Sequence, residues 1–403
     1  MEQYDIIVVG GGPAGLQFAR HTAKKSDLSI IVLERNSNIS DNKKSTGGTF
    51  QEVIEGYNIP DSVIMDQNET VKFESPNKKS EINLPNYTLD FPQFLEYLAK
   101  DAERNGAVIQ TNSTVTGIET LNGTVTEISA EENGQTVQYE PKIVVDASGP
   151  AGVISEQLNM MNKKVGQKAV GKEYEVSGSL AFNSFLIAFD HTYAPGGYAW
   201  VFAAGEKTFK IGVCWVNSLH KEHRQTDSLT IDDYIQRLMN ADDRWVVDTI
   251  EDHHSGKAII DNTTNKRVEN NALAIGDAVS DINPLLGECI RPVMESAVLA
   301  SNATIKAIGD GEIKHLMTYS KKWNQSKSTR WKMQHIMADM IYNFSENQQD
   351  EFVDALGAMN QKQIDRLQKY NLQLKDILSM YPFRITDMPN LAQSTKDVIV
   401  GNV

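Results

Sequence analysis

Residues 4–15 read Tyr4-Asp5-Ile6-Ile7-Val8-Val9-Gly10-Gly11-Gly12-Pro13-Ala14-Gly15 and are the strongest indication of the fold. Its first six residues form a nearly continuous apolar run, which is typical of a parallel strand buried on both faces. The glycines permit a tight turn and let the backbone approach a pyrophosphate. A helix expected over 16–25 would present its N-terminal N–H groups and positive dipole to the phosphates. Taken alone, such a glycine motif can also be a mere turn.

A second strand is expected over 28–33, and it ends at Glu34-Arg35. Glu34 stands at the spacing where a carboxylate hydrogen-bonds a ribose 2′-hydroxyl and disfavours a 2′-phosphate. Arg35 either touches the adenosine half of the ligand or pairs at the surface. Strand, glycine turn, helix and acidic residue together predict a dinucleotide site, which in this part of the chain consists of Gly10, Gly12, Pro13, Ala14, Gly15, Glu34 and Arg35.

A second motif, about 260 residues later, indicates which dinucleotide is bound. A buried strand expected over 272–275 runs into Gly276-Asp277-Ala278, and Asn283-Pro284 and Gly287-Glu288 follow it. A carboxylate here can bind a ribityl chain, and a helix N-terminus can face the electron-rich end of a flavin ring. FAD is therefore the expected cofactor. The alternative is a solvated turn after a core strand.

At four segments within residues 1–310 the chain resembles the geranylgeranyl reductase family of FAD enzymes, in the p-hydroxybenzoate-hydroxylase-like group. Three of them are shared by many flavoproteins: Gly10–Gly15 with Glu34-Arg35, Asp146–Gly149, and Gly276–Glu288. The fourth, Tyr198-Ala199-Trp200-Val201-Phe202, is more typical of these reductases, where it lines an apolar substrate tunnel. The resemblance implies reduction of isolated double bonds in a polyprenyl chain, with reduced FAD as hydride donor. Beyond the first motif, the flavin contacts it implies are Ser45, Thr46, Gly47, Gly48, Asp146, Gly149, Gly276, Asp277, Pro284, Gly287, Glu288, Cys289 and Ile290.

The chain departs from the family pattern at three places. Ala203 follows Tyr-x-Trp-x-Phe where the family often has proline, and Cys289 stands where glycine is commoner. Many archaeal members carry a cysteine in the flavin-facing loop, where this chain reads Ser45-Thr46-Gly47-Gly48. These changes leave the expected flavin site intact, and they leave the exact substrate and any cysteine-assisted step open.

An unactivated alkene offers no carbonyl to polarise, so its reduction needs an apolar slot beside the flavin and a proton source. Tyr198, Trp200 and Phe202 alternate along an expected strand, which places all three on one side of it. They are the predicted substrate-binding residues, and Tyr198, Trp200 and Cys289 are the candidate catalytic residues. The alternative is that the three aromatic residues are simply core residues of a second sheet.

The predicted fold class is α/β, with a glutathione-reductase-type, Rossmann-like FAD domain, an antiparallel-sheet substrate domain and a helical C-terminal cap. The FAD domain is assigned to 1–62, 98–165 and 266–315, the substrate domain to 63–97 and 166–265, and the cap to 316–403. Asn122-Gly123 and Asn133-Gly134 predict the turns of a three-stranded meander over 114–140. The apolar stretch of the cap either packs as core or forms an amphipathic lid or membrane-surface helix, and its members are Trp323, Trp331, Met333, Met337, Met340 and Tyr342.

Composition narrows the classes of partner. The 403 residues carry a net charge of −14, which argues against a nucleic-acid binder. No secretory signal or membrane-spanning run is recognised, so a cytoplasmic protein is expected, with peripheral contact at the inner membrane face left open. Cys214 and Cys289 are too far apart in sequence for a redox pair or a metal site, and the adjacent His253 and His254 would point to opposite sides of a strand.

The expected partners are a lipophilic polyprenyl substrate and an external electron donor. No second glycine-rich nucleotide motif is recognised, so the donor could be NAD(P)H, a ferredoxin or a deazaflavin. Two alternatives remain. One is a flavin monooxygenase or halogenase on the same fold, although the Trp-x-Trp-x-Ile segment usual in halogenases is not found. The other is a non-catalytic prenyl-lipid binding protein, which the intact Gly12, Gly15, Glu34 and Asp277 argue against.

Overall fold

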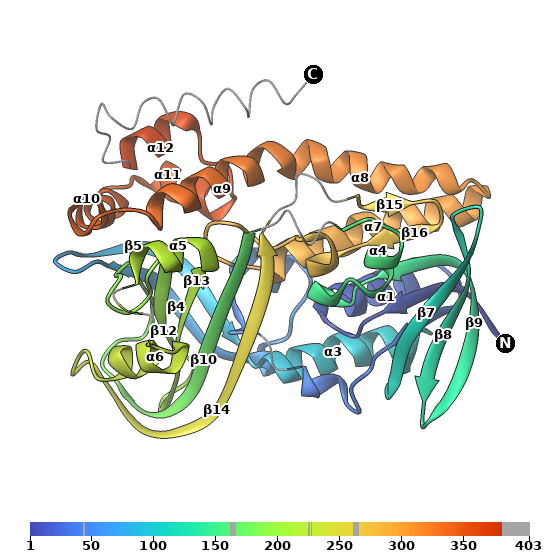
Figure 1. The fold of residues 1–403 in the computed structure, drawn as a ribbon, viewed down its shortest axis with the longest axis horizontal. Helices are drawn as coiled ribbons and strands as arrows, with labels where there is room; N and C mark the ends of the chain where they lie inside the picture. The colour runs from blue at the N-terminus through green and yellow to red at the C-terminus, as the bar shows by residue number, and fades with distance from the viewer. Residues whose placement is uncertain (43–44, 162–166, 225, 227, 261–265, 381–403) are drawn as a thin grey trace.

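A computed structural model describes residues 1–42, 45–161, 167–224, 226, 228–260 and 266–380 (Figure 1). In these ranges the chain forms two eight-stranded sheets, which lie beside one another, and a row of C-terminal helices that runs along the edge of both. The prediction of an α/β fold with two sheets and a helical cap is confirmed.

The first sheet is built around the apolar strand that opens the sequence. β1 (Glu2–Val9) pairs in parallel with β2 (Ile30–Leu33) on one side and with β9 (Gln135–Asp146) on the other. The remaining parallel strands are β6 (Val108–Gln110) and β16 (Ala272–Ala274), while β15 (Val268–Glu269) is an antiparallel edge. The buried faces of β1 confirm the assignment, since Ile6, Ile7 and Val8 are inaccessible to solvent.

The meander over 114–140 is also confirmed. It consists of β7 (Ser113–Leu121), β8 (Thr124–Glu132) and β9. Asn122 and Asn133 have φ angles of 53° and 50°, and the glycine after each is also at positive φ. Two successive residues in this region are what a two-residue type I′ hairpin turn requires, which is why Asn-Gly marks both turns.

Helices cover the first sheet. α1 (Pro13–Lys25) packs against α3 (Phe91–Arg104) and α7 (Ile290–Asp310). α7 continues through Gly309 and ends at Asp310. Gly311 follows it at φ 69°. In this left-handed conformation the Gly311 N–H donates hydrogen bonds to the carbonyls of Ala307 and Ile308, which ends the helix.

The second sheet runs in the order β14-β10-β13-β12-β11-β4-β5-β3. The prediction of an antiparallel sheet is correct for every pair of neighbouring strands except one, because β11 pairs with β4 in parallel. Between these two strands the chain passes through β6, β7, β8 and β9 of the first sheet, so no hairpin fixes their relative direction. The bounds are β3 (Gly48–Phe50), β4 (Ile64–Glu74), β5 (Lys79–Leu89), β10 (Gln167–Leu180), β11 (Phe185–Ala188), β12 (Gly197–Ala203), β13 (Thr208–Val216) and β14 (Trp245–Ile260).

The cap packs against the second sheet through α10 (Glu346–Gly357) and α11 (Gln361–Gln368), which contact β5, and against α7 on the first sheet through α8 (Met317–Trp323). Its apolar stretch packs as core rather than as an exposed lid, since Trp323, Trp331 and Met337 are each at most 4% exposed. Residues 381–403 of the predicted cap lie outside the described part of the chain. The bounds of its other helices are α9 (Thr329–Ile341) and α12 (Leu374–Met380), with a π-helical turn, Asn324–Ser328, between α8 and α9.

The shorter helices are α2 (Gln51–Gly56), α4 (Val153–Gln157), α5 (Asn217–His223) and α6 (Ile231–Met239). The domain division stays a prediction, but two elements cross its boundaries. The boundary between 97 and 98 falls inside α3, which packs against α1 as one unit. β3 lies in the range given to the FAD domain, and it pairs with β5 of the second sheet.

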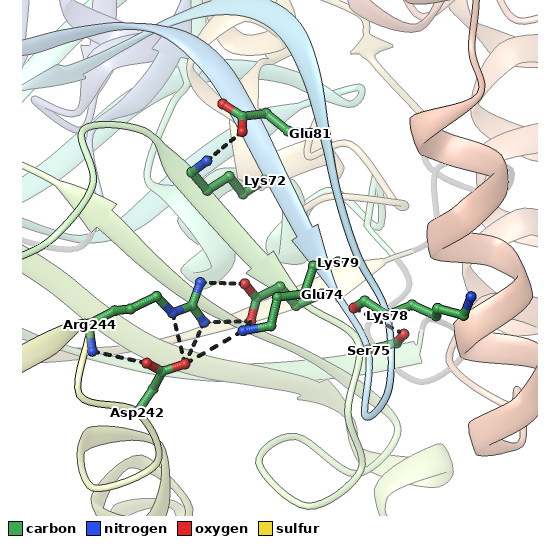
Figure 2. Close-up of polar contacts among 8 residues, drawn as sticks. All are labelled: Lys72, Glu74, Ser75, Lys78, Lys79, Glu81, Asp242 and Arg244. Atoms are coloured by element: carbon green, nitrogen blue, oxygen red, sulfur yellow. Dashed lines mark hydrogen bonds and ion pairs between the residues drawn. The ribbon is translucent and has the colours of Figure 1, made fainter.

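A charged cluster ties the β4–β5 hairpin to the start of β14 (Figure 2). The Arg244 guanidinium donates to both carboxylate oxygens of Glu74, at 2.6 and 2.8 Å, and its Nε donates to Asp242 at 2.8 Å. Lys72 and Glu81 form a simpler cross-strand pair on the same hairpin, at 2.5 Å. Bidentate pairs of this kind are stronger than single exposed ones.

We therefore expect Arg244→Ala to lower the free energy of unfolding by about 2 kcal/mol, because it removes the close pairs with Glu74 and Asp242 and leaves these partly buried carboxylates with the more distant Lys79, 3.7 Å from each. Glu81→Gln is the matched control: Glu81 is 46% exposed, and losing its pair should cost about 0.5 kcal/mol or less. Urea denaturation followed by circular dichroism measures both. Equal losses in the two variants would contradict the assignment of Figure 2's cluster as the tie between these strands.

Candidate functional site

The glycine turn after β1 is packed closely against the protein on all sides but one. A Cβ at Gly15 would lie 2.1 Å from the Gly10 carbonyl oxygen, and one at Gly10 would lie 2.4 Å from the carbonyl oxygen of Ala147. At Gly12 the nearest atom would be 3.6 Å away, on the Asn42 side chain. Gly12 is the N-cap of α1 and has no side-chain cap. The helix N-terminus therefore faces space in which an anion can bind.

Glu34 braces this turn. Its Oε2 accepts a hydrogen bond from the Gly11 N–H at 2.7 Å, its Oε1 accepts from the Asn36 N–H at 2.9 Å, and the residue is 7% exposed. Its contact with a ribose stays a prediction. Arg35 next to it is exposed.

The Asp146 carboxylate is occupied by the protein itself. It accepts hydrogen bonds from the Ser148, Ile154 and Ser155 backbone N–H groups and is 0% exposed. Through its bonds with Ile154 and Ser155, Asp146 caps the first turn of α4. Gly149 lies in the turn between them, at φ 68°. Direct contact of Asp146 or Gly149 with a cofactor stays a prediction.

The second flavoprotein motif comes against the first. A Cβ at Gly276 would lie 2.9 Å from the Cβ of Ala14, so the two turns meet where both need a small residue. The turn is held by Asp281, which accepts from the Gly276 N–H at 2.8 Å and pairs with the buried Arg267 at 2.7 Å. Asp277 thereby comes to the same edge of the sheet as the N-terminus of α1.

Two carboxyl oxygens at this edge are buried without a hydrogen-bond partner among the described residues: Oδ1 of Asp277 and Oε2 of Glu288. Burial, and for Asp277 also the neighbouring Asp281, raises the pKa of Asp277 to about 6. Burial raises the pKa of Glu288 to about 7, against the lowering effect of Arg291. Unsatisfied buried oxygens are rare in folded proteins, and hydroxyl and N–H donors of a flavin nucleotide would satisfy them.

A cavity of about 280 Å³ lies between this edge and the second sheet. Tyr198, Trp200 and Phe202 of β12 all line it, with consecutive ring centroids 5.8 and 6.5 Å apart. The prediction that the three rings share one side is confirmed. Predicted cofactor residues line the same cavity, namely Ser45, Thr46, Gly48, Asp277, Pro284, Gly287, Glu288, Cys289 and Ile290.

The two cysteines also meet in this cavity, although their sequence separation gave no reason to associate them. Both are free thiols that line it. Burial raises the pKa of Cys214 to about 12 and the pKa of Cys289 further still. Both thiols are therefore protonated at neutral pH, as is the Tyr198 hydroxyl, which donates to the Leu286 carbonyl at 2.5 Å. Cys214 on β13 is directly opposite Tyr198 on β12.

Sequence reasoning missed several residues of the cavity wall. Glu173 of β10 and His254 of β14 line it, as do Tyr342 and Tyr370 of the cap. His254 faces the cavity while His253 stacks edge-on against Tyr174, so the two histidines do point to opposite sides. No local pattern marks Glu173 as a cavity residue, because its place depends on the strand order of the sheet.

In the described part of the chain, none of the helices combines the length and apolar character needed to cross a membrane. No group of three His, Cys, Asp or Glu side chains in that part is arranged to hold a metal ion.

Comparisons with known proteins agree with this architecture. A family model described as lycopene cyclase protein matches residues 5–394. A digeranylgeranylglycerophospholipid reductase of Haloferax volcanii is 31% identical over 380 residues, which covers 90% of this chain and 92% of that protein. A second reductase of that name, from Methanosphaera stadtmanae, is 25% identical over 89% of this chain and 92% of its own length.

Solved structures show the same fold at lower identity. A geranylgeranyl bacteriochlorophyll reductase-like protein of Thermoplasma acidophilum superimposes with a TM-score of 0.85 at 20% identity, covering 97% of this chain and all of that one. A flavin-dependent brominase superimposes with a TM-score of 0.73 at 15% identity, covering 98% and 99% of the two chains. The match to the Haloferax reductase extends over nearly the whole of both chains, and the chain belongs to the geranylgeranyl reductase family of flavoproteins.

Proposed function

We propose that this protein reduces carbon–carbon double bonds of a geranylgeranyl-type lipid, with FAD as its cofactor. One observation carries the proposal: an apolar cavity walled by Tyr198, Trp200 and Phe202 is bordered on its other side by the residues predicted to face a flavin. The names of the Haloferax and Methanosphaera relatives support a glycerophospholipid with geranylgeranyl chains as the substrate class.

The residues present fit FAD. The N-terminus of α1 at Gly12 offers room and N–H donors for a pyrophosphate. Asp277 and Glu288 each hold a buried oxygen without a partner among the described residues. The loop over 45–48 would lie against the flavin ring, with Lys210 fixing it by donating to the Thr46 carbonyl at 2.8 Å. When bound and reduced, FAD supplies the hydride.

The chain's own part is to exclude water and to supply the proton. The aromatic wall gives an alkene an apolar surface without competing hydrogen bonds. Hydride adds to one carbon of the double bond, and a proton must reach the other. Tyr198 and Cys289 hold protons at the cavity surface, and Glu288, with its pKa raised to about 7, is the acid best matched to neutral pH.

The test is anaerobic reoxidation of the reduced protein. We expect the purified protein to be yellow, and its reduced flavin to be reoxidised by a geranylgeranyl phospholipid without oxygen, with gain of two hydrogen masses per bond reduced. A saturated phytanyl lipid of the same headgroup is the matched control and should leave the flavin reduced.

Other outcomes separate the alternatives. Rapid reoxidation by oxygen alone, with the lipid inert, would favour the monooxygenase or halogenase class. A colourless protein that binds the lipid but takes up no FAD would favour a non-catalytic lipid binder. The electron donor, whether NAD(P)H, ferredoxin or deazaflavin, and peripheral contact with the cytoplasmic membrane face remain predictions. Titrating each donor in the same cuvette, and flotation with vesicles, would test them.

A further inference from the structure

Trp200 forms a hydrogen bond with a buried carboxylate, that of Glu173. No local pattern in the sequence predicts this contact. The indole Nε1 of Trp200 donates to Oε2 of Glu173 at 2.6 Å. Both residues are buried, Trp200 at 8% and Glu173 at 1% exposed. An N–H bond to an ionised oxygen is about twice as strong as one between neutral groups, and burial protects this one from water. The bond fixes the plane of the indole in the cavity wall.

The register of the sheet shows how the bond is made. Trp200 on β12 is opposite Gly212 on β13, and Gly212 is opposite Glu173 on β10. The indole must therefore cross a whole strand to reach the carboxylate, and it passes over the one position in that row without a side chain. A Cβ at Gly212 would lie 2.3 Å from the indole Cζ2 and 2.6 Å from its Cε2.

The other carboxylate oxygen of Glu173 lies toward the next strand, β14, rather than toward the indole. Oε1 of Glu173 has no hydrogen-bond partner among the described residues, and the Nε2 of His254 lies 3.7 Å from it. His254 is directly opposite Glu173 on β14. Its pKa is lowered chiefly by burial, so it is neutral at neutral pH. Glu173 is thus committed to one strong bond, with the indole.

We propose that Glu173 is a positioning residue, which fixes the Trp200 indole across Gly212 and so sets which double bond of the lipid chain reaches the reacting position. A geranylgeranyl chain offers similar double bonds at regular intervals, and hydrogen bonds cannot choose between them because an isolated alkene has no group that makes one. A rigid ring in the wall supplies a steric register. This inference rests on the proposed lipid reduction.

The positions of the reduced bonds test it. Glu173→Ala should broaden the distribution of reduced positions in the product and slow lipid-driven reoxidation about tenfold, while FAD affinity and reduction by dithionite stay as in the wild type. Glu173→Gln should restore the wild-type pattern, because an amide oxygen also accepts from the indole. Glu251→Gln is the matched control: it makes the same change on the neighbouring strand β14, where Glu251 is exposed and lies outside the cavity lining, and it should change nothing.

Two further variants keep the proposal testable if Glu173→Ala folds poorly. Gly212→Ala should displace the ring from the other side and broaden the product pattern in the same way. In a Trp200→Phe background the Glu173→Ala change should have no further effect, because the bond is already absent. A wild-type product pattern in Glu173→Ala, or a Glu173→Gln variant that behaves like Glu173→Ala, would overturn the proposal.

The placement of the ring can be measured without lipid. In protein labelled with 5-fluorotryptophan, the Trp200 signal, assigned through Trp200→Phe, should be single in the wild type and in Glu173→Gln, and split or broadened in Glu173→Ala. An unchanged signal in Glu173→Ala would overturn the proposal even in a protein that reduces lipid. The opposite result is also informative. If the wild type does not reduce lipid but the Trp200 signal is split in Glu173→Ala as expected, the proposed function is overturned and the role of Glu173 in positioning the ring is not.

Discussion

Gly12→Ala should fold like the wild type and bind FAD at least about 100-fold more weakly, because the new methyl group takes the place of a phosphate oxygen. The backbone at Gly12, with φ −79° and ψ 179°, suits alanine, and the new Cβ would meet no protein atom closer than 3.6 Å. The space it fills is the space in front of the α1 N-terminus. Titration of the flavin-free protein with FAD, followed by flavin fluorescence, measures the affinity.

Gly15→Ala is the matched comparison within the same turn. There the Cβ would lie 2.1 Å from the Gly10 carbonyl oxygen, so β1 and α1 must move apart. We expect this variant to lose both FAD binding and stability, which thermal unfolding of the flavin-free protein would show. A Gly12→Ala protein that binds FAD normally would remove the α1 N-terminus from the proposed site, and one that unfolds would mean that Gly12 is needed for folding rather than for the ligand.

The second large effect concerns the stability of the flavin-free protein against pH. Asp277 has its pKa raised from 3.8 to about 6, and Glu288 from 4.5 to about 7. A raised pKa in the folded state means that the folded protein holds these protons more tightly than the unfolded chain. The stabilisation is therefore complete below the unfolded values and is lost as the pH rises through about 6 and 7.

Between pH 5 and 8 we expect the wild-type protein without flavin to lose about 3 kcal/mol of unfolding free energy through these two groups. The double variant Asp277→Asn, Glu288→Gln should lack this loss and be the more stable protein at pH 8. Urea denaturation of both proteins at the two pH values measures the difference. Parallel pH dependence in wild type and variant would show that the two carboxyl groups are not held in the proposed buried state.

Local pattern in the sequence was sufficient for much of this protein. The strand, glycine turn and helix at the N-terminus, both Asn-Gly hairpins and the shared face of Tyr198, Trp200 and Phe202 follow from the conformations and periodicities of neighbouring residues. Each depends on contacts within about a dozen residues, so it can be predicted before the rest of the chain is known. The family resemblance includes two of these segments, Gly10–Gly15 and Tyr198–Phe202, and the match to the Haloferax reductase confirms it.

The residues that share the cavity are distant in sequence, and local patterns do not predict their association. Cys214 and Cys289 come together there, as do Trp200 and Glu173, and β11 pairs in parallel with β4. These contacts depend on the order and register of strands, which are selected by burial summed over both sheets rather than by any one segment. A shift of one residue in β10 would turn Glu173 away from the indole without changing the alternation of the sequence. Local sequence patterns therefore predict the fold class and the cofactor motif, while the wall of the substrate cavity depends on the packing of the whole chain.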